Sequence, residues 1–357
     1  MMKPVIEING RKIGPGHDTY VIAELSGNHN GDFDRAVALV KAAKESGADA
    51  AKLQTYTADT LTIDSDAAPF QVPVNNTWAG ETLHSLYRQA YTPWEWQPKL
   101  KALADDLGID LFSSPFDKSA VDLLVKMDVP ALKVASFELV DIALVEYIAG
   151  QGKPVIMSTG LSVLPEVVEG VEAVRRAGND ELALLKCNSG YPALPEEAHL
   201  PTIPHMAEMF GVPVGYSDHT LGIGVPIAAV ALGACIVEKH ITLSRADGGP
   251  DAAFSLEPAE LTALVTGIRQ ADQALNGVSY EPTPKEEHNR IFRRSLFVVQ
   301  DVAQGERLTD RNVRSIRPGN GLLPKYLPQV LGRTAARSLK RGTPLDWPDL
   351  GTGQGED

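Results

Sequence analysis

The sequence predicts a (β/α)8 barrel, the TIM-barrel architecture, followed by a small β-rich domain. Eight apolar runs of four to seven residues recur between residues 20 and 240, and helix-like segments separate them. The runs are continuous rather than alternating, as expected for parallel strands that are buried on both faces. Eight strand–helix units in about 250 residues favour a closed barrel. An open doubly wound sheet has the same alternation, because a sequence does not show whether the first and last strands pair.

The expected elements can be placed in order along the chain. Segment 33–47 has apolar residues at helical spacing and ends at Gly47, and segment 165–178 has the same pattern. A further helix over 261–277 closes the barrel region. The expected strands are 20–25, 49–55, 109–115, 131–136, 154–159, 182–187, 212–218 and 235–240.

Changes in composition and in the pattern of apolar residues also predict the domain boundaries. Residues 1–278 form the barrel, and the polar stretch 279–292, which carries two prolines, is a linker. Short β-rich runs and a glycine turn mark a second domain over 293–350. The glycine-rich segment 351–357 is expected to be a disordered tail.

Composition excludes several classes of protein. The chain has 357 residues, of which 43% are hydrophobic and 22% charged, and its formal net charge is −13. This is a soluble globular composition without the basic surface that a nucleic-acid partner needs. The longest apolar stretch, from Val225, has about 13 residues, too few to span a bilayer, and no secretory signal is visible. Cys187 and Cys235 lie in apolar runs and are expected to be buried free thiols, which fits a reducing cytoplasm.

Lysines and serines gather at the predicted carboxyl ends of the strands, where a barrel of this type has its active site. Lys52 and Lys133 stand in apolar runs, where lysine is rarely buried without a partner. With serines at neighbouring strand ends, they favour an anion site over structural ion pairs. For Lys186 and Lys239 the two interpretations stay equally open.

Two histidines end consecutive predicted strands. His219 and His240 occupy matching places on the seventh and eighth strands, so their side chains can converge on a divalent metal. The alternative, two unrelated core or rim histidines, is equally open on spacing alone. No third histidine or cysteine ligand is evident, so a metal here would keep open positions, as a catalytic metal does. Asp218 and Glu238 are weaker ligand candidates, because we expect each to face away from its neighbouring histidine.

Nine motifs in order resemble the sialic acid synthase family over essentially the full chain. They are A-E-L-S-G-N-H-N-G, K-L-Q-T, F-S-S-P-F-D, L-K-V-A-S-F-E, K-P-V-I-M-S-T-G, L-L-K-C-N-S-G-Y-P, G-Y-S-D-H-T-L-G, V-E-K-H-I-T-L and G-G-P-D-A-A-F-S. The C-terminal part is similar to the antifreeze-like (SAF) domain of these synthases. Within the family, A-Y-T-P-W-E-W, S-S-P-F-D and A-S-F-E are most similar to pseudaminic acid synthases.

The resemblance implies a transferase that condenses phosphoenolpyruvate with an amino-sugar and releases phosphate by C–O cleavage. It implies a divalent metal (Mn²⁺, Mg²⁺ or Co²⁺) on His219 and His240, and Glu24 as the group that handles a proton. It also implies a domain-swapped homodimer. The residues implied for phosphoenolpyruvate are Lys52, Ser114, Lys133, Ser136, Ser158, Ser189 and Ser217. Those implied for the sugar are Gln54, Glu138, Tyr191, Asp251 and, from the partner subunit, Arg317.

Other functions remain as alternatives at this point. The amino-sugar could be the one that leads to N-acetylneuraminate or to legionaminate instead of pseudaminic acid. A Schiff-base aldolase would use Lys133 or Lys52 as its nucleophile. A non-catalytic sugar-binding protein on the same barrel is the third alternative.

Overall fold

The amino-terminal part of the chain forms a closed barrel of eight parallel strands. The computed structural model describes residues 4–72 and 80–353, and the chain divides into two compact units after Asn276. The barrel order is β10-β3-β4-β5-β6-β7-β8-β9, and pairing of β10 with β3 closes it, which confirms the TIM barrel and excludes the open sheet. The strands are β3 (Tyr20–Glu24), β4 (Ala50–Thr55), β5 (Asp110–Pro115), β6 (Leu132–Val134), β7 (Val155–Ser158), β8 (Leu182–Cys187), β9 (Val214–Asp218) and β10 (Ile236–His240).

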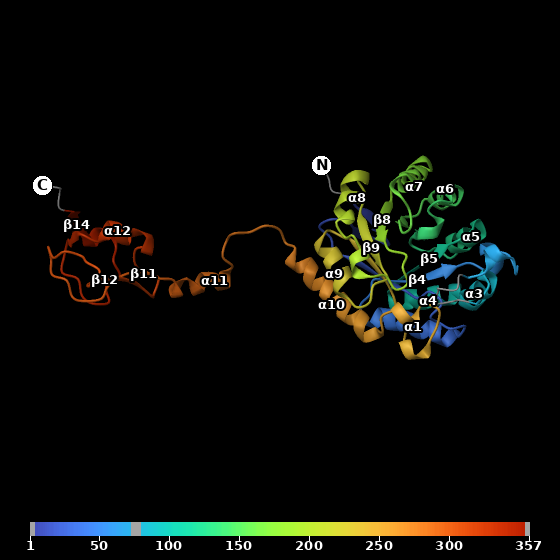
Figure 1. Ribbon diagram of the computed structural model, residues 1–357, viewed down its shortest axis with the longest axis horizontal. Coiled ribbons are helices and arrows are strands. Elements are labelled where there is room, and N and C mark those ends of the chain that lie inside the picture. The colour runs from blue at the N-terminus through green and yellow to red at the C-terminus, as the bar shows by residue number, and fades with distance from the viewer. Residues whose placement is uncertain (1–3, 73–79, 354–357) are drawn as a thin grey trace. The chain divides into compact units, whose positions relative to one another are not determined.

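Helices surround these strands, as Figure 1 shows for the first unit. The expected helices over 33–47, 165–178 and 261–277 are all present as α1, α7 and α10. The helix α1 begins where the Asp32 side chain accepts a hydrogen bond from the backbone N–H of Arg35. The helices are α1 (Phe33–Glu45), α2 (Ala58–Leu61), α3 (Leu83–Ala90), α4 (Gln97–Leu107), α5 (Lys118–Lys126), α6 (Ile142–Ala149), α7 (Leu164–Arg176), α8 (Thr202–Phe210), α9 (Gly224–Ala231) and α10 (Pro258–Ala274).

A β-hairpin covers the amino-terminal end of the barrel. The strands β1 (Ile6–Ile8) and β2 (Arg11–Ile13) pair in antiparallel fashion. Their isoleucines are buried in the same core cluster as Tyr20, the first residue of β3. The hairpin therefore shields from water the end of the barrel that lies opposite the carboxyl ends of the strands.

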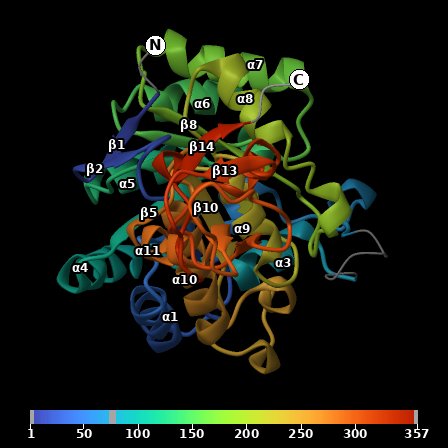
Figure 2. The same cartoon turned by 90° about the vertical axis from the view of Figure 1, so that its left-hand side faces the viewer.

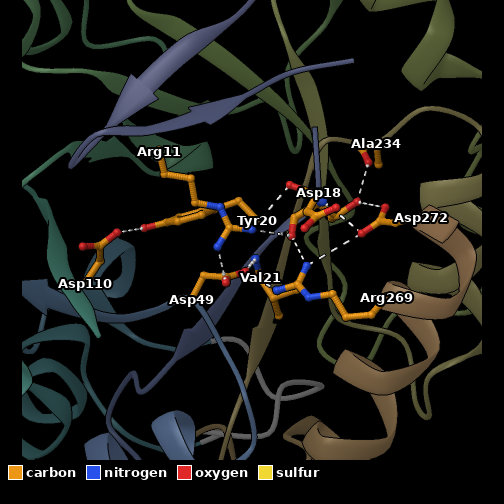
Figure 3. A network of polar contacts seen from close by, with 10 residues as sticks. Arg11, Asp18, Tyr20, Val21, Asp49, Asp110, Ala234, Arg269 and Asp272 are labelled. Carbon is orange, nitrogen blue, oxygen red and sulfur yellow. Dashed lines mark hydrogen bonds and ion pairs between the residues drawn. The ribbon is translucent and has the colours of Figure 1, made fainter. Parts of the chain in front are cut away.

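At this amino-terminal end, charged side chains connect the hairpin, the barrel strands and α10 (Figure 3). Asp49, just before β4, accepts hydrogen bonds from Arg11 of the hairpin and from Arg269 of α10, the latter at 2.7 Å. Its carboxylate also accepts from the backbone N–H of Val21 at 2.8 Å. One carboxylate thus joins the hairpin, two neighbouring strands and the last helix of the barrel.

The second unit has a hydrophobic core of its own, which includes Leu296, Val298 and Leu345. Two antiparallel pairs build it, and Figure 2 shows β13 and β14 side by side. This small β-rich unit confirms the fold predicted for the C-terminal part. Its elements are α11 (Pro284–His288), β11 (Ser295–Val298), β12 (Val313–Ile316), α12 (Leu327–Val330), β13 (Arg333–Ala335) and β14 (Leu350–Gly353).

Two details of the predicted segments differ from the structure. The stretch 279–292 contains α11, where the Thr283 side chain accepts from the backbone N–H of Glu286 and Glu286 accepts from that of Thr283. The expected tail over 351–357 begins too early, because residues 351–353 belong to β14. Residues 354–357 lie outside the described part of the chain. Among the helices of the described residues, none has the length and apolarity needed to cross a bilayer.

Candidate active site

A cavity of about 420 Å³ opens at the carboxyl ends of the barrel strands. Every one of the eight strands places at least one side chain in its lining. Almost all of the residues implied by the family resemblance meet here. They are Glu24, Lys52, Gln54, Ser114, Lys133, Ser136, Glu138, Ser158, Tyr191, Ser217, His219, His240 and Asp251.

Two of the implied residues are not in this lining. Ser189 follows β8 but does not line the cavity, although a methyl group added at Gly160 would meet both its hydroxyl and that of Ser136. Arg317 is exposed and belongs to the second unit, between β12 and Pro318. A single barrel therefore assembles the implied set without Ser189 and Arg317.

The two predicted anion-binding lysines are both buried in the cavity. The Lys133 ammonium donates to the Ser158 hydroxyl at 2.6 Å and to the Val134 carbonyl at 3.1 Å. Burial lowers the pKa of Lys133. The Lys52 ammonium lies 3.3 Å from the Ser114 hydroxyl. Because Lys133 contacts only neutral oxygens, it retains the capacity to pair with a negatively charged ligand.

Lys52 also lies between two carboxylates. Its ammonium is 2.6 Å from Glu24 Oε2 and 3.5 Å from Glu238 Oε1. Burial raises the pKa of Glu24 to about 7, against the opposing effect of Lys52. Gln54 donates to the other Glu24 oxygen at 3.1 Å. Glu24 can thus hold or release a proton near neutral pH, which is the property required of an acid–base group.

The structure corrects the expectation for Glu238. We expected Glu238 to face away from His240, but both line the cavity. Residues two apart on a strand point to the same side, and these two are separated by Lys239 alone. Side-chain alternation along β10 therefore by itself places Glu238 and His240 on one face.

The two histidines converge as their strand positions predict. Their ring centroids are 5.2 Å apart. The His219 Nδ1–H donates to the Asn188 carbonyl at 2.6 Å, so the Nε2 atom is the nitrogen with a free lone pair. His240 Nδ1 is buried without a hydrogen-bond partner and lies 3.8 Å from Asp251 Oδ2.

This donor set fits a metal that keeps open coordination positions. Burial lowers the pKa of His240 well below its usual value, so its ring stays neutral, as a ligand must. Within residues 4–72 and 80–353, His, Cys, Asp and Glu form no group of three or more that could hold a metal. The protein thus offers two imidazoles, and water or substrate oxygens would complete the coordination sphere.

Of the two lysines for which the sequence left two interpretations open, Lys239 forms a structural ion pair and Lys186 lies outside the cavity lining. Lys239 is fully buried 2.6 Å from Asp218 Oδ2, and it also donates to the Thr220 carbonyl. Lys186 donates to the Cys187 carbonyl and to Asn188 Oδ1. Neither lysine lines the cavity.

Aromatic rings and acidic groups also line the cavity. The Tyr191 ring lies 4.5 Å from the His219 ring, between centroids. Asp251 accepts a hydrogen bond from Ser26, and burial raises the pKa of Glu138 to about 7. The lining therefore combines rings with groups that can exchange hydrogen bonds with a sugar.

Several residues of the cavity lining were not predicted from the sequence. Cys187 is buried, as expected of a free thiol, but it also faces the cavity, with Sγ 3.9 Å from His219 Nδ1. Burial raises the pKa of this thiol, but hydrogen bonds with His219 and Ser136 and the charges of His219 and Lys133 together lower it to about 7. None of the apolar lining residues was predicted from the sequence, although those on α3 recur at helical spacing. This group includes Tyr56, Leu61, Leu83, Leu86, Tyr87, Ala90, Phe116 and Phe137.

Comparisons with known proteins agree with this geometry. The NeuB family model matches residues 39–280, and the SAF domain model matches residues 293–351. The pseudaminic acid synthase of Helicobacter pylori is 42% identical over 331 residues, covering 92% of this chain and 97% of the relative. The N,N'-diacetyllegionaminic acid synthase of Legionella pneumophila is 37% identical over 350 residues, covering 96% of this chain and 98% of that relative.

A solved structure gives the same result for the fold. The crystal structure of the N-acetylneuraminic acid synthetase of Leptospira borgpetersenii, in complex with citrate, matches with a TM-score of 0.72 and 30% identity. The match covers 81% of this chain and 95% of that one. The chain therefore belongs to the NeuB family and is a phosphoenolpyruvate-dependent synthase, a transferase.

Proposed function

We propose that this protein is a pseudaminic acid synthase. It condenses phosphoenolpyruvate with 2,4-diacetamido-2,4,6-trideoxy-β-L-altropyranose and water, and it releases pseudaminic acid and phosphate. The observation that carries the proposal is one cavity in which two buried lysines face two converging histidines. The identity of 42% to the Helicobacter pylori enzyme supports the choice of sugar.

The polar end of the cavity binds phosphoenolpyruvate. Lys133 and Lys52 supply positive charge, and hydroxyl groups donate short hydrogen bonds to the phosphate and carboxylate oxygens. Lys133 contributes most, because it contacts no carboxylate that would neutralise it. The hydroxyl groups in this role are those of Ser114, Ser136, Ser158 and Ser217, which line the cavity, and the role implied for Ser189, outside that lining, stays a prediction.

His219 and His240 would hold a divalent cation (Mn²⁺, Mg²⁺ or Co²⁺). A cation bound there supplies Lewis-acid polarisation of the open-chain aldehyde oxygen. The carbon–carbon bond forms between C3 of phosphoenolpyruvate and the aldehyde carbon, water adds to C2, and phosphate leaves by cleavage of the C–O bond. Glu24, with its pKa near 7, takes the proton of the water as it adds.

Other residues of the lining bind the sugar. Gln54, Glu138, Tyr191 and Asp251, which line the cavity, take this role. We further propose that Arg317 reaches the amino-sugar from the partner subunit of a domain-swapped homodimer. The buried cysteines Cys187 and Cys235, neither of which forms a disulfide, support a cytoplasmic location.

A direct assay tests the proposed reaction. Purified protein is mixed with phosphoenolpyruvate and with the trideoxy sugar, the legionaminic acid precursor or N-acetylmannosamine, and phosphate release and product mass are measured. We expect release with the trideoxy sugar and a product with the mass of pseudaminic acid. Preference for another sugar would instead make the protein a neuraminate or legionaminate synthase. No release with any sugar would favour a sugar-binding protein, and a borohydride-trapped lysine with EDTA-resistant turnover would favour the aldolase.

Two substitutions test the metal assignment. We expect His219→Ala and His240→Ala each to lower kcat by about 100-fold or more without unfolding the protein, and EDTA to do the same to the wild type until Mn²⁺ is added. Metal content after dialysis should fall in both variants. His205→Ala, on the exposed face of α8, is the control and should keep its metal and activity. Wild-type turnover in either cavity variant would remove the assignment.

A further inference from the structure

The helix α3 directs its apolar face into the cavity and not into a hydrophobic core. Leu83, Leu86, Tyr87 and Ala90 recur at helical spacing on one side of this helix, and all four line the cavity. None of them belongs to a core cluster of the described residues, and each is partly buried. The apolar side of such a helix gains free energy when an apolar part of a ligand covers it and excludes water.

Neighbouring side chains extend this face into a continuous surface. The Tyr56 ring packs edge-on against Tyr87, with centroids 5.8 Å apart, and against Phe116, with centroids 5.2 Å apart. Leu61 from α2 also lines the cavity. We call this surface the apolar wall, and it consists of Tyr56, Leu61, Leu83, Leu86, Tyr87 and Phe116.

The cavity is therefore chemically divided. The strand ends contribute Lys52, Lys133 and the two histidines, whereas the apolar wall comes from α2, α3 and the residues that follow β4 and β5. Leu61, Leu83, Leu86 and Phe116 have no polar side-chain atom that could replace the water lost from a sugar hydroxyl. Methyl groups placed there lose no hydrogen bond and gain by leaving water.

We propose that the apolar wall selects the amino-sugar, favouring hexoses that present methyl groups, from a deoxygenated C6 and from acetamido substituents, over hexoses with hydroxyl groups in those places. This inference rests on the proposed function, because it assigns a specificity to the sugar side of the same cavity. It makes Leu83 and Leu86 specificity-determining residues. An apolar pocket rejects an added hydroxyl by up to about 100-fold, so the preference in kcat/KM should lie between about 10- and 100-fold.

The test compares two sugars in three variants. The ratio of kcat/KM for the 2,4-diacetamido-2,4,6-trideoxy hexose to that for N-acetylmannosamine is measured by phosphate release in the wild type, Leu83→Asn and Leu86→Asn. We expect the ratio to fall at least about tenfold in both variants, through the KM of the sugar, while the KM of phosphoenolpyruvate stays unchanged. Arg88→Ala is the matched control, because Arg88 is exposed on the opposite face of α3.

The outcomes separate the inference from the function on which it rests. If the wild type releases no phosphate with any amino-sugar, the proposed function fails. If the wild type uses the trideoxy sugar but both folded asparagine variants keep the wild-type ratio, only the role of the apolar wall is overturned. Should either variant fail to fold, as judged by its melting temperature, Leu86→Ala and Leu83→Ala replace it. These smaller side chains should still lower the ratio, since they remove contacts to the methyl groups.

Discussion

The buried ion pair between Asp218 and Lys239 lies directly beside the two histidines. Both side chains are completely inaccessible to water, and the two residues are register partners on adjacent strands. Asp218 also accepts hydrogen bonds from the backbone N–H and the hydroxyl of Thr220. The pair therefore joins the carboxyl ends of β9 and β10, next to His219 and His240, and it does so outside the cavity lining.

Removing one partner of this pair should destabilise the barrel strongly. We expect Lys239→Met to lower the free energy of unfolding by about 3–5 kcal/mol, because Asp218 would be left charged and buried. The double variant Asp218→Asn, Lys239→Met should recover most of this loss, since it buries no charge. Urea unfolding followed by tryptophan fluorescence measures both values. A double variant no more stable than the single one would contradict the argument.

The sequence predicted which residues reach the cavity better than it predicted their partners. Positions at the carboxyl ends of strands predicted that Lys52 and Lys133 reach the active site and that His219 lies near His240. The pairing of Lys239 with Asp218 depends instead on the register between β9 and β10, which no pattern within either strand contains. For this reason the sequence pattern offered Asp218 only as a weak metal-ligand candidate and not as an ion-pair partner.

At the scale of elements, α10 is tied to the barrel by Arg269. Its guanidinium donates to the Thr19 carbonyl and, at 2.7 Å, to Asp49 Oδ2 (Figure 3). We expect Arg269→Lys to lower the free energy of unfolding by about 1–3 kcal/mol, because one ammonium cannot reproduce the planar fork that reaches both acceptors. Arg176→Ala, which removes an exposed pair with Glu146, should cost less than about 1 kcal/mol under the same conditions. Equal losses in the two variants would show that the fork has no special role.

The loop between β3 and α1 should make stability depend on pH through His29. Burial lowers the pKa of His29 to about 4, and Arg35 lowers it further in the same direction. The backbone N–H of Gly31 donates to Nδ1, so the ring is held neutral while Nε2 lies 3.1 Å from the Thr92 hydroxyl. The folded pKa is below the unfolded value of about 6.5, so as pH falls from about 6.5 to 4 only the unfolded chain takes up the proton.

The fall in stability across this range should be on the order of 2–3 kcal/mol for the wild type relative to His29→Asn. Asparagine keeps an acceptor for the Gly31 N–H but does not titrate, so the difference between the two proteins isolates this histidine from other groups. Denaturant midpoints between pH 4 and pH 7 give the measurement. A difference that does not change with pH would show that His29 is not held neutral by the fold.

At the scale of the whole molecule, a second domain beginning near residue 293 was predictable, because a new set of short apolar runs begins there. The second unit indeed has its own core. The hairpin β1–β2 and the helix α3 were not predicted. Strands of three residues are too short for a periodic signal, and the apolar stripe of α3 faces the cavity and not the core. Patterns of hydrophobicity record burial, so they identify ligand-facing apolar residues only when the cavity is already known.

The proposed swapped dimer leads to a complementation experiment. If Arg317 acts on the barrel of the partner subunit, a dimer of one Arg317→Ala subunit and one His240→Ala subunit contains one intact site and one site with both defects. Co-expressed at equal levels, the two inactive variants should recover about one quarter of the wild-type rate, because half of the dimers are mixed and each has one working site. Arg314→Ala, an exposed arginine on β12, should stay active by itself. If Arg317 instead served its own barrel, every site in the mixture would carry one defect, and the rate would stay at the level of the separate variants.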